Sequence, residues 1–225
     1  MAQKWRVTGS DSKRRPKRPP KPLDQDSLPE IALRYAGRYA TTRAKLHAYL
    51  DRKLRERGWA GEDMPDVGAL VTRMAELRYV DDAAFATMKA AAIGRRGYGA
   101  RRVSEALKQA GVEEADREAP EQEARANRWE AARRLAQRKR IGPYALDPAD
   151  RPQREKQIAA FLRAGHDLAM ARLWVNAAPG ELPEGAQLSY CTKWSHRGYL
   201  FEVWWIDLSI KTGENKGYTF RIRDQ

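Results

Sequence analysis

Three short segments that each end in glycine constrain the fold of this chain more than any other feature. They are "LRERG" ending at Gly58, "LKQAG" ending at Gly111 and "FLRAG" ending at Gly165, and they recur with a period of about 53 residues. An apolar residue lies four positions before each glycine, which predicts a helix that ends on a left-handed C-cap. Repetition at this period is typical of tandem helical units that bury their apolar faces against their neighbours.

The segment from residue 31 to residue 178 has helical periodicity throughout, and no part of it alternates with the period of a strand. Helix N-caps are expected at Thr41 or Thr42, at Asp66, and at Asp81 or Asp82. The residues expected to face inward are Leu46, Leu50, Leu54, Val67, Leu70, Val71, Met74, Leu77, Phe85, Met88 and Ala92. The sequence therefore predicts an all-α protein.

The chain is strongly basic, with 43 Lys and Arg against 30 Asp and Glu, a net charge of +13 and an isoelectric point near 10.0. This balance favours nucleic acid, an acidic protein or an anionic membrane surface as the partner. Residues 1–28 combine proline, lysine and arginine with little to bury, which predicts a disordered basic arm. The single cysteine, Cys191, excludes an intrachain disulfide and fits a cytoplasmic protein, and no apolar run predicts a membrane span or a secretory signal.

The last part of the chain, residues 181–225, has a different character. Aromatic and β-branched residues dominate 199–210, and a turn over 213–217 leads to a second apolar run, so a β-hairpin is expected. The preceding "APGELPEG" is typical of a linker. Three interpretations remain open: a hairpin docked on the helices, a piece of another β domain, or an appended segment without function. The second and third are favoured, so the tail is expected to be dispensable.

The sequence contains no recognisable catalytic or metal-binding constellation. The carboxylates of Asp81 and Asp82 are better explained as helix caps than as an acid–base pair. The histidines lack a shared ligand spacing, a zinc pattern is excluded by the lone cysteine, and "GRRGYGARR" lacks the spacing of a phosphate-binding loop. We expect a protein that is not an enzyme and needs no cofactor or metal.

Basic residues recur on the helices of all three copies of the repeat. If equivalent helices present equivalent faces, these residues form one basic stripe that contacts a partner or nucleic acid. The predicted stripe residues are Arg43, Lys45, Arg52, Lys53, Arg95, Arg96, Arg101, Arg102, Arg133, Arg134, Arg138, Lys139 and Arg140. A solvated basic face without a partner is the alternative explanation.

Two segments, "RYVDDAAFA" (78–86) and "RRGYGARRVSEALKQAGV" (95–112), resemble the RecX family of recombination regulators. Weaker similarity covers 40–58, 131–145 and 157–178, so that the match spans about 31–180. The resemblance implies three tandem three-helix repeats in a curved, elongated array, here assigned to 29–82, 83–126 and 127–180. It also implies a monomeric protein that binds the RecA recombinase filament, with its single-stranded DNA, and inhibits or modulates it.

Two parts of the chain depart from the family pattern. The run 112–127 lacks the apolar residues of a packed helix and contains Pro120, which is expected to interrupt it. Nothing beyond Pro179 resembles the family. Two other functions stay open: a helix-turn-helix DNA-binding protein with 99–111 as its recognition helix, and a scaffold protein. A sequence reader would concentrate its basic residues on one helix, whereas here they recur on three.

Overall fold

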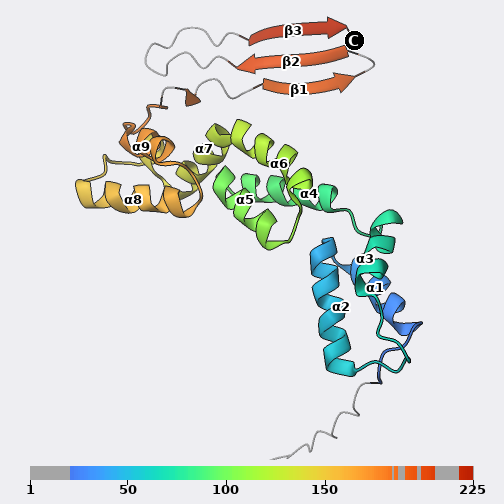
Figure 1. Ribbon diagram of the computed structural model, residues 1–225. Helices are drawn as coiled ribbons and strands as arrows, with labels where there is room; N and C mark the ends of the chain where they lie inside the picture. Colours follow the sequence, from blue (N-terminus) through green and yellow to red (C-terminus); the bar gives the residue numbers. More distant parts are fainter. Residues whose placement is uncertain (1–20, 184, 187–190, 197–198, 206–217, 225) are drawn as a thin grey trace, which may run out of the picture.

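The computed structural model describes residues 21–183, 185–186, 191–196, 199–205 and 218–224 (Figure 1). Within these residues the chain is helical from Ser27 to Asn176, and a small antiparallel sheet follows. The helices are α1 (Ser27–Arg38), α2 (Arg43–Arg57), α3 (Val67–Glu76), α4 (Asp82–Arg95), α5 (Ala100–Gln109), α6 (Glu114–Ala126), α7 (Arg128–Lys139), the short 3-10 helix Gly142–Tyr144, α8 (Arg151–Arg163) and α9 (Leu168–Asn176).

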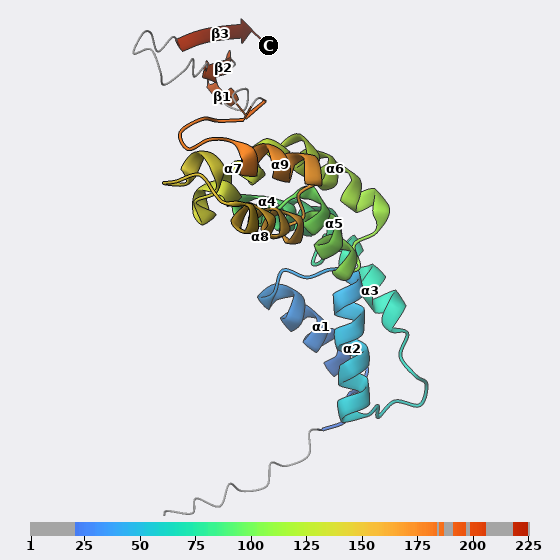
Figure 2. The same cartoon turned by 90° about the vertical axis from the view of Figure 1, so that its left-hand side faces the viewer.

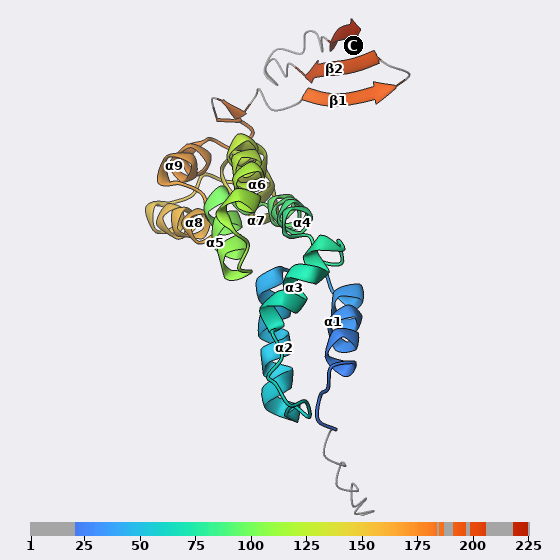
Figure 3. The ribbon, with the colours of Figure 1, turned by 45° about the vertical axis from the view of Figure 1, so that its right-hand side comes forward.

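The helices pack in three groups of three, each around its own apolar core. Leu46 and Leu50 centre the core of the first repeat (α1–α3), Val103 and Leu107 that of the second (α4–α6), and Phe161 and Trp174 that of the third (α7–α9). Figures 2 and 3 show the first repeat projecting from the body formed by the other two, so the molecule is bent and elongated. The prediction of an all-α array of three-helix repeats is confirmed.

The helix ends follow the local sequence signals. The Thr42 hydroxyl, Asp66 carboxylate and Asp81 carboxylate each accept a hydrogen bond from a backbone N–H in the first turn of the helix that they precede. Gly58, Gly111 and Gly165 have φ values of 77°, 70° and 91°, the left-handed region in which glycine is favoured. The predicted helix ends at these glycines are confirmed, although the ψ of 172° at Gly58 differs from the left-handed helical conformation that was expected there.

The start of the helical region differs from the prediction. Residues 21–28 were assigned to the disordered arm, but Leu23 is fully buried and its backbone exchanges hydrogen bonds with Gly58 and Ala60. Leu28 is also buried, on α1. An apolar leucine on each side of the Asp24–Ser27 turn supplies the core contacts that the arm composition concealed. The predicted disorder of residues 1–20 lies outside the described residues.

Two inward-facing predictions and the helix break at Pro120 are wrong. Leu77 and Met88 are 48% and 51% exposed, because α3 ends at Glu76 and Met88 lies on the outer side of α4. The helix α6 continues through Pro120, which is buried. Proline lacks one backbone hydrogen bond, and the burial of Pro120, with Ala124 of the same helix packed against the second core, offsets that loss.

The C-terminal segment begins later than predicted. Leu182 and Ala186 pack against the core of the third repeat, and the Gly180 N–H donates to the Pro143 carbonyl, so the expected linker belongs partly to the helical body. The strands β1 (Cys191–His196), β2 (Tyr199–Trp205) and β3 (Tyr218–Asp224) form a sheet in the order β1-β2-β3. The expected hairpin corresponds to β2 and β3, which pair in antiparallel register from Tyr199 opposite Asp224 to Trp205 opposite Tyr218. Among the described residues, no helix has the length and apolarity needed to cross a bilayer.

Candidate functional site

A basic groove of about 470 Å³ lies where α2 of the first repeat meets α4 and α5 of the second. It is lined by Lys45, Lys89, Ile93, Arg96, Tyr98, Arg102, Glu105, Ala106, Gln109 and Ala110. Four cationic side chains and one carboxylate therefore share one concave surface. A hollow with this imbalance concentrates positive potential and attracts anionic groups.

The two lysines of the basic groove face each other from different repeats. The Lys45 ammonium lies 4.6 Å from the centre of the Phe85 ring, close enough for a cation–π contact. Burial, together with the charge of Lys89, lowers the pKa of Lys45. Among the described residues neither lysine forms an ion pair, so a bound anion would relieve their mutual repulsion.

Tyr98 brings arginines from two repeats to the same groove. The guanidinium carbon of Arg96 lies 5.4 Å from the centre of the Tyr98 ring, and that of Arg138 on α7 lies 5.7 Å from it. Arg138 also donates a hydrogen bond to the Arg96 carbonyl. Both flanking glycines are needed, since a Cβ at Gly97 would lie 2.7 Å from the Leu135 nitrogen and one at Gly99 would collide with the Gly165 carbonyl.

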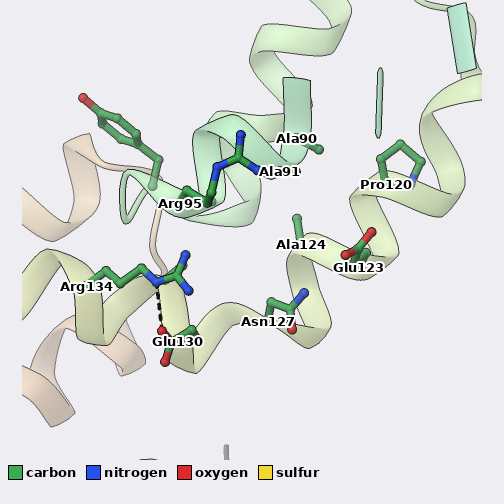
Figure 4. A pocket seen from close by; sticks show the side chains of 12 residues that line it. Ala90, Ala91, Arg95, Pro120, Glu123, Ala124, Asn127, Glu130 and Arg134 are labelled. Atoms are coloured by element: carbon green, nitrogen blue, oxygen red, sulfur yellow. Dashed lines mark hydrogen bonds and ion pairs between the residues drawn. The ribbon is translucent and has the colours of Figure 1, made fainter. Parts of the chain in front are cut away.

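A second hollow, of about 250 Å³, lies between α4, α6 and α7 (Figure 4). Arg95 and Arg134 extend into it from α4 and α7, and the Arg134 Nε lies 2.8 Å from a Glu130 oxygen. Glu123 and several alanines also line it. Because two arginines face two glutamates here, this hollow lacks the charge imbalance of the basic groove.

Several predicted stripe residues stabilise the fold instead of lining the basic groove. Arg43 is engaged with carboxylates of the second repeat. Arg101 donates to the Leu162 carbonyl of the third repeat, and Arg133 donates to the Tyr144 hydroxyl over 3.0 Å. Their guanidinium groups hold helices together, as buried or interface arginines commonly do.

The remaining predicted residues lie in the second half of α2 and at the C-terminal end of α7. Arg52 and Lys53 on α2 contact the Tyr49 ring and form ion pairs with Glu56. Lys139 and Arg140 are exposed at the end of α7. None of these four lines the basic groove, which contains Lys45, Arg96 and Arg102 of the predicted set and is approached by Arg138 through Tyr98.

Sequence reasoning missed two residues of the basic groove. Lys89 stands among alanines in "MKAAA", without a motif, and only the joint between the first and second repeats brings it beside Lys45. Tyr98 lies in the quoted arginine-rich turn, and its position between two arginine pairs was the available signal. In the part of the chain that the structure describes, no three His, Cys, Asp or Glu side chains gather in a way that would hold a metal ion.

Comparison with known proteins gives a consistent result. The "Regulatory protein RecX" of Myxococcus xanthus (strain DK1622) is 32% identical over 181 residues, which cover 76% of this chain and 96% of that protein. A solved structure described as regulatory protein RecX shares 20% identity with a TM-score of 0.50, covering 66% of this chain and 70% of the other. The RecX structure from Lactobacillus salivarius has 18% identity and a TM-score of 0.48, covering 65% and 90% respectively. No family model matches the chain.

Proposed function

The chain belongs to the RecX family of regulatory proteins, and we propose that it modulates the RecA recombinase by binding to the RecA–DNA filament. It acts as a regulatory protein through occupancy of the filament, not through catalysis. The resemblance of residues 78–112 to the family's most specific segments supports this role. The proposal places the protein in the cytoplasm as a monomer.

The observation that carries the proposal is the basic groove, in which cations from different repeats converge on one surface. Lys45 comes from α2, Lys89 from α4 and Arg102 from α5, and only Glu105 opposes them among the residues lining the groove. In the proposal, these side chains contact acidic groups of the filament and phosphates of its single-stranded DNA. Contacts made by several repeats on one frame add to one another, because the later contacts form within the same complex.

A helix-turn-helix function is less well supported by the geometry of α5. Val103 and Leu107 of this helix are fully buried in the second core. The Arg101 guanidinium is bonded to the Leu162 carbonyl of the third repeat. A recognition helix must leave such side chains available for base edges, so α5 is better explained as a packing helix with one edge in the basic groove.

The proposal is tested by measuring RecA ATPase activity on single-stranded DNA with the full chain and with the variant Lys45→Gln/Lys89→Gln/Arg102→Gln. The parent should lower the ATPase rate at substoichiometric amounts. The half-maximal concentration of the variant should rise by about tenfold or more, as expected for lost charged contacts at an interface. The matched control Arg52→Gln/Arg140→Gln/Arg151→Gln removes the same charge outside the groove.

The control variant should inhibit nearly as well as the parent, and thermal melting should show that both triple variants remain folded. If the parent leaves the ATPase rate unchanged at equimolar concentration, the proposed function is wrong. If both triple variants weaken inhibition equally, net charge matters and the basic groove is not the contact surface.

A further inference from the structure

The two joints between successive repeats are built from different kinds of contact. The first repeat is joined to the second mainly by side chains around Arg43. Its backbone N–H donates to Asp82 Oδ1 over 2.9 Å and its Nε lies 3.3 Å from Asp82 Oδ2. Its Nη2 lies 3.0 Å from an Asp116 oxygen and 3.6 Å from a Glu113 oxygen. We call these four residues the Arg43 latch.

Few other contacts supplement the Arg43 latch. The Thr42 hydroxyl donates to the Ala110 carbonyl over 2.6 Å, and the Ala44 methyl group lies against Gly111. Among the described residues, none belongs to both the first and the second apolar core. The joint therefore depends on polar contacts, and much of its strength lies in ion pairs of an arginine whose side chain is 37% exposed.

The joint between the second and third repeats is made by backbone and by shared apolar packing. The Gly99 N–H donates to the Ala164 carbonyl over 2.9 Å, and the Arg101 N–H donates to the Gly165 carbonyl over 3.3 Å. The buried His166 ring lies 3.1 Å from the Gly97 carbonyl. Tyr98 packs against the cores of both repeats. Salt should weaken these backbone hydrogen bonds little, because neither the N–H donor nor the carbonyl acceptor carries a net charge.

From this contrast we propose that the Arg43 latch is an electrostatic hinge. The first repeat changes its angle relative to a rigid body formed by α4–α9 when the ion pairs are screened or replaced. The ion pairs from Arg43 to Glu113 and Asp116 weaken as salt rises, since the screening length falls from about 10 Å at 0.1 M to about 3 Å at 1 M, whereas the pair to the buried Asp82 is screened much less. The device lets one chain fit surfaces of different curvature.

The hinge is tested by pulsed electron paramagnetic resonance distances in the full chain, with Cys191→Ser to remove the native thiol. One spin-label pair, Ala48→Cys with Lys156→Cys, joins exposed helical positions of the first and third repeats. The other pair, Met88→Cys with Lys156→Cys, joins the second and third repeats. Raising salt from about 0.05 M to about 1 M should broaden or shift the first distribution by several ångströms and leave the second unchanged.

A variant separates the latch from general effects of salt. Glu113→Gln/Asp116→Asn removes the two outer carboxylates and keeps the buried Asp82, and it should give the high-salt distribution already at low salt. Its control, Glu118→Gln/Glu121→Gln, changes two carboxylates of the same helix whose partners, Gln122 and Arg125, also lie in α6. The inference is overturned if the first pair stays narrow in the latch variant at both salt concentrations, or if both pairs broaden together. RecA and DNA are absent, so the outcome is independent of the proposed function.

Discussion

Replacing Gly165 by alanine should destabilise the protein more than the same change at Gly58, the corresponding glycine of the first repeat. Both glycines end a helix with positive φ, 91° at Gly165 and 77° at Gly58. Their surroundings differ, because a Cβ at Gly165 would lie 2.6 Å from the Arg102 nitrogen, whereas a Cβ at Gly58 meets nothing within 4 Å. Both substitutions force alanine into a positive φ, and only the one at Gly165 adds a collision with backbone.

The magnitude follows from these two terms. Left-handed backbone costs alanine about 1–2 kcal/mol, and the stiffer unfolded chain returns about 0.4–1 kcal/mol, which leaves roughly 1 kcal/mol. At Gly58 the ψ of 172° lies in a region that is essentially restricted to glycine and costs other residues about 1–3 kcal/mol, so Gly58→Ala should cost roughly 1–2 kcal/mol. At Gly165 the obstructing atom is backbone and α5 must move away, which adds about 1–3 kcal/mol, as in other overpacked sites. Gly165→Ala should therefore cost about 2–4 kcal/mol.

Urea unfolding followed by far-ultraviolet circular dichroism measures both free energies of unfolding, provided that the denaturant slopes agree between variants. Trp174, fully buried in the third core, is expected to dominate any fluorescence change specific to that repeat. If Gly165→Ala is as stable as Gly58→Ala, the close backbone contact between the second and third repeats does not restrict the chain, and the argument for a rigid joint fails.

Three further predictions concern stability. Burial lowers the pKa of His166 below its ordinary 6.5, so its contribution to stability should be complete above pH 6.5 and lost as the pH falls toward the lowered pKa of the folded state. When the urea midpoint is measured against pH, His166→Gln should flatten the curve in this range. An unchanged slope would contradict the assignment to His166. Thr42→Val removes a helix cap and the buried bond to Ala110 and should cost about 1–3 kcal/mol in thermal denaturation, whereas Thr87→Val, at an exposed hydroxyl, should cost much less. A chain ending at Gly180 should be about 1–3 kcal/mol less stable than one ending at Gln187, because it lacks Leu182 and Ala186 of the third core. Equal melting temperatures would instead support the interpretation of this segment as a linker.

The sequence predicted those features whose causes are local. A glycine after an amphipathic helix and an aspartate or threonine before one act within a single turn, so the ends at Gly58 and the caps at Thr42, Asp66 and Asp81 were predictable. The repeat period indicated tandem helical units, whereas their division into three-helix repeats was an implication of the resemblance to the RecX family. Leu77 was mispredicted because α3 ends at Glu76, where the helical period no longer decides its direction.

Features that depend on long-range contacts were not predictable from these patterns. Arg43 was placed on the stripe, yet its partners Asp82 and Asp116 stand 39 and 73 positions away in the chain. Asp82 was considered only as a helix cap, and no local pattern distinguishes an arginine in an ion pair from one in solvent. Lys89 was overlooked for the converse reason, since its importance arises only from the proximity of Lys45.

The basic groove and the Arg43 latch both lie at the joint between the first and second repeats, and this shared position has a thermodynamic consequence. Lys45 belongs to the first repeat, while Lys89, Arg96 and Arg102 belong to the second. The affinity for an anion that contacts both repeats depends on the hinge angle. By linkage, binding of that anion must in turn shift the distribution of hinge angles. A substitution in the Arg43 latch, which touches no ligand, should therefore alter binding in the groove, and a bound polyanion should alter the salt at which the latch releases.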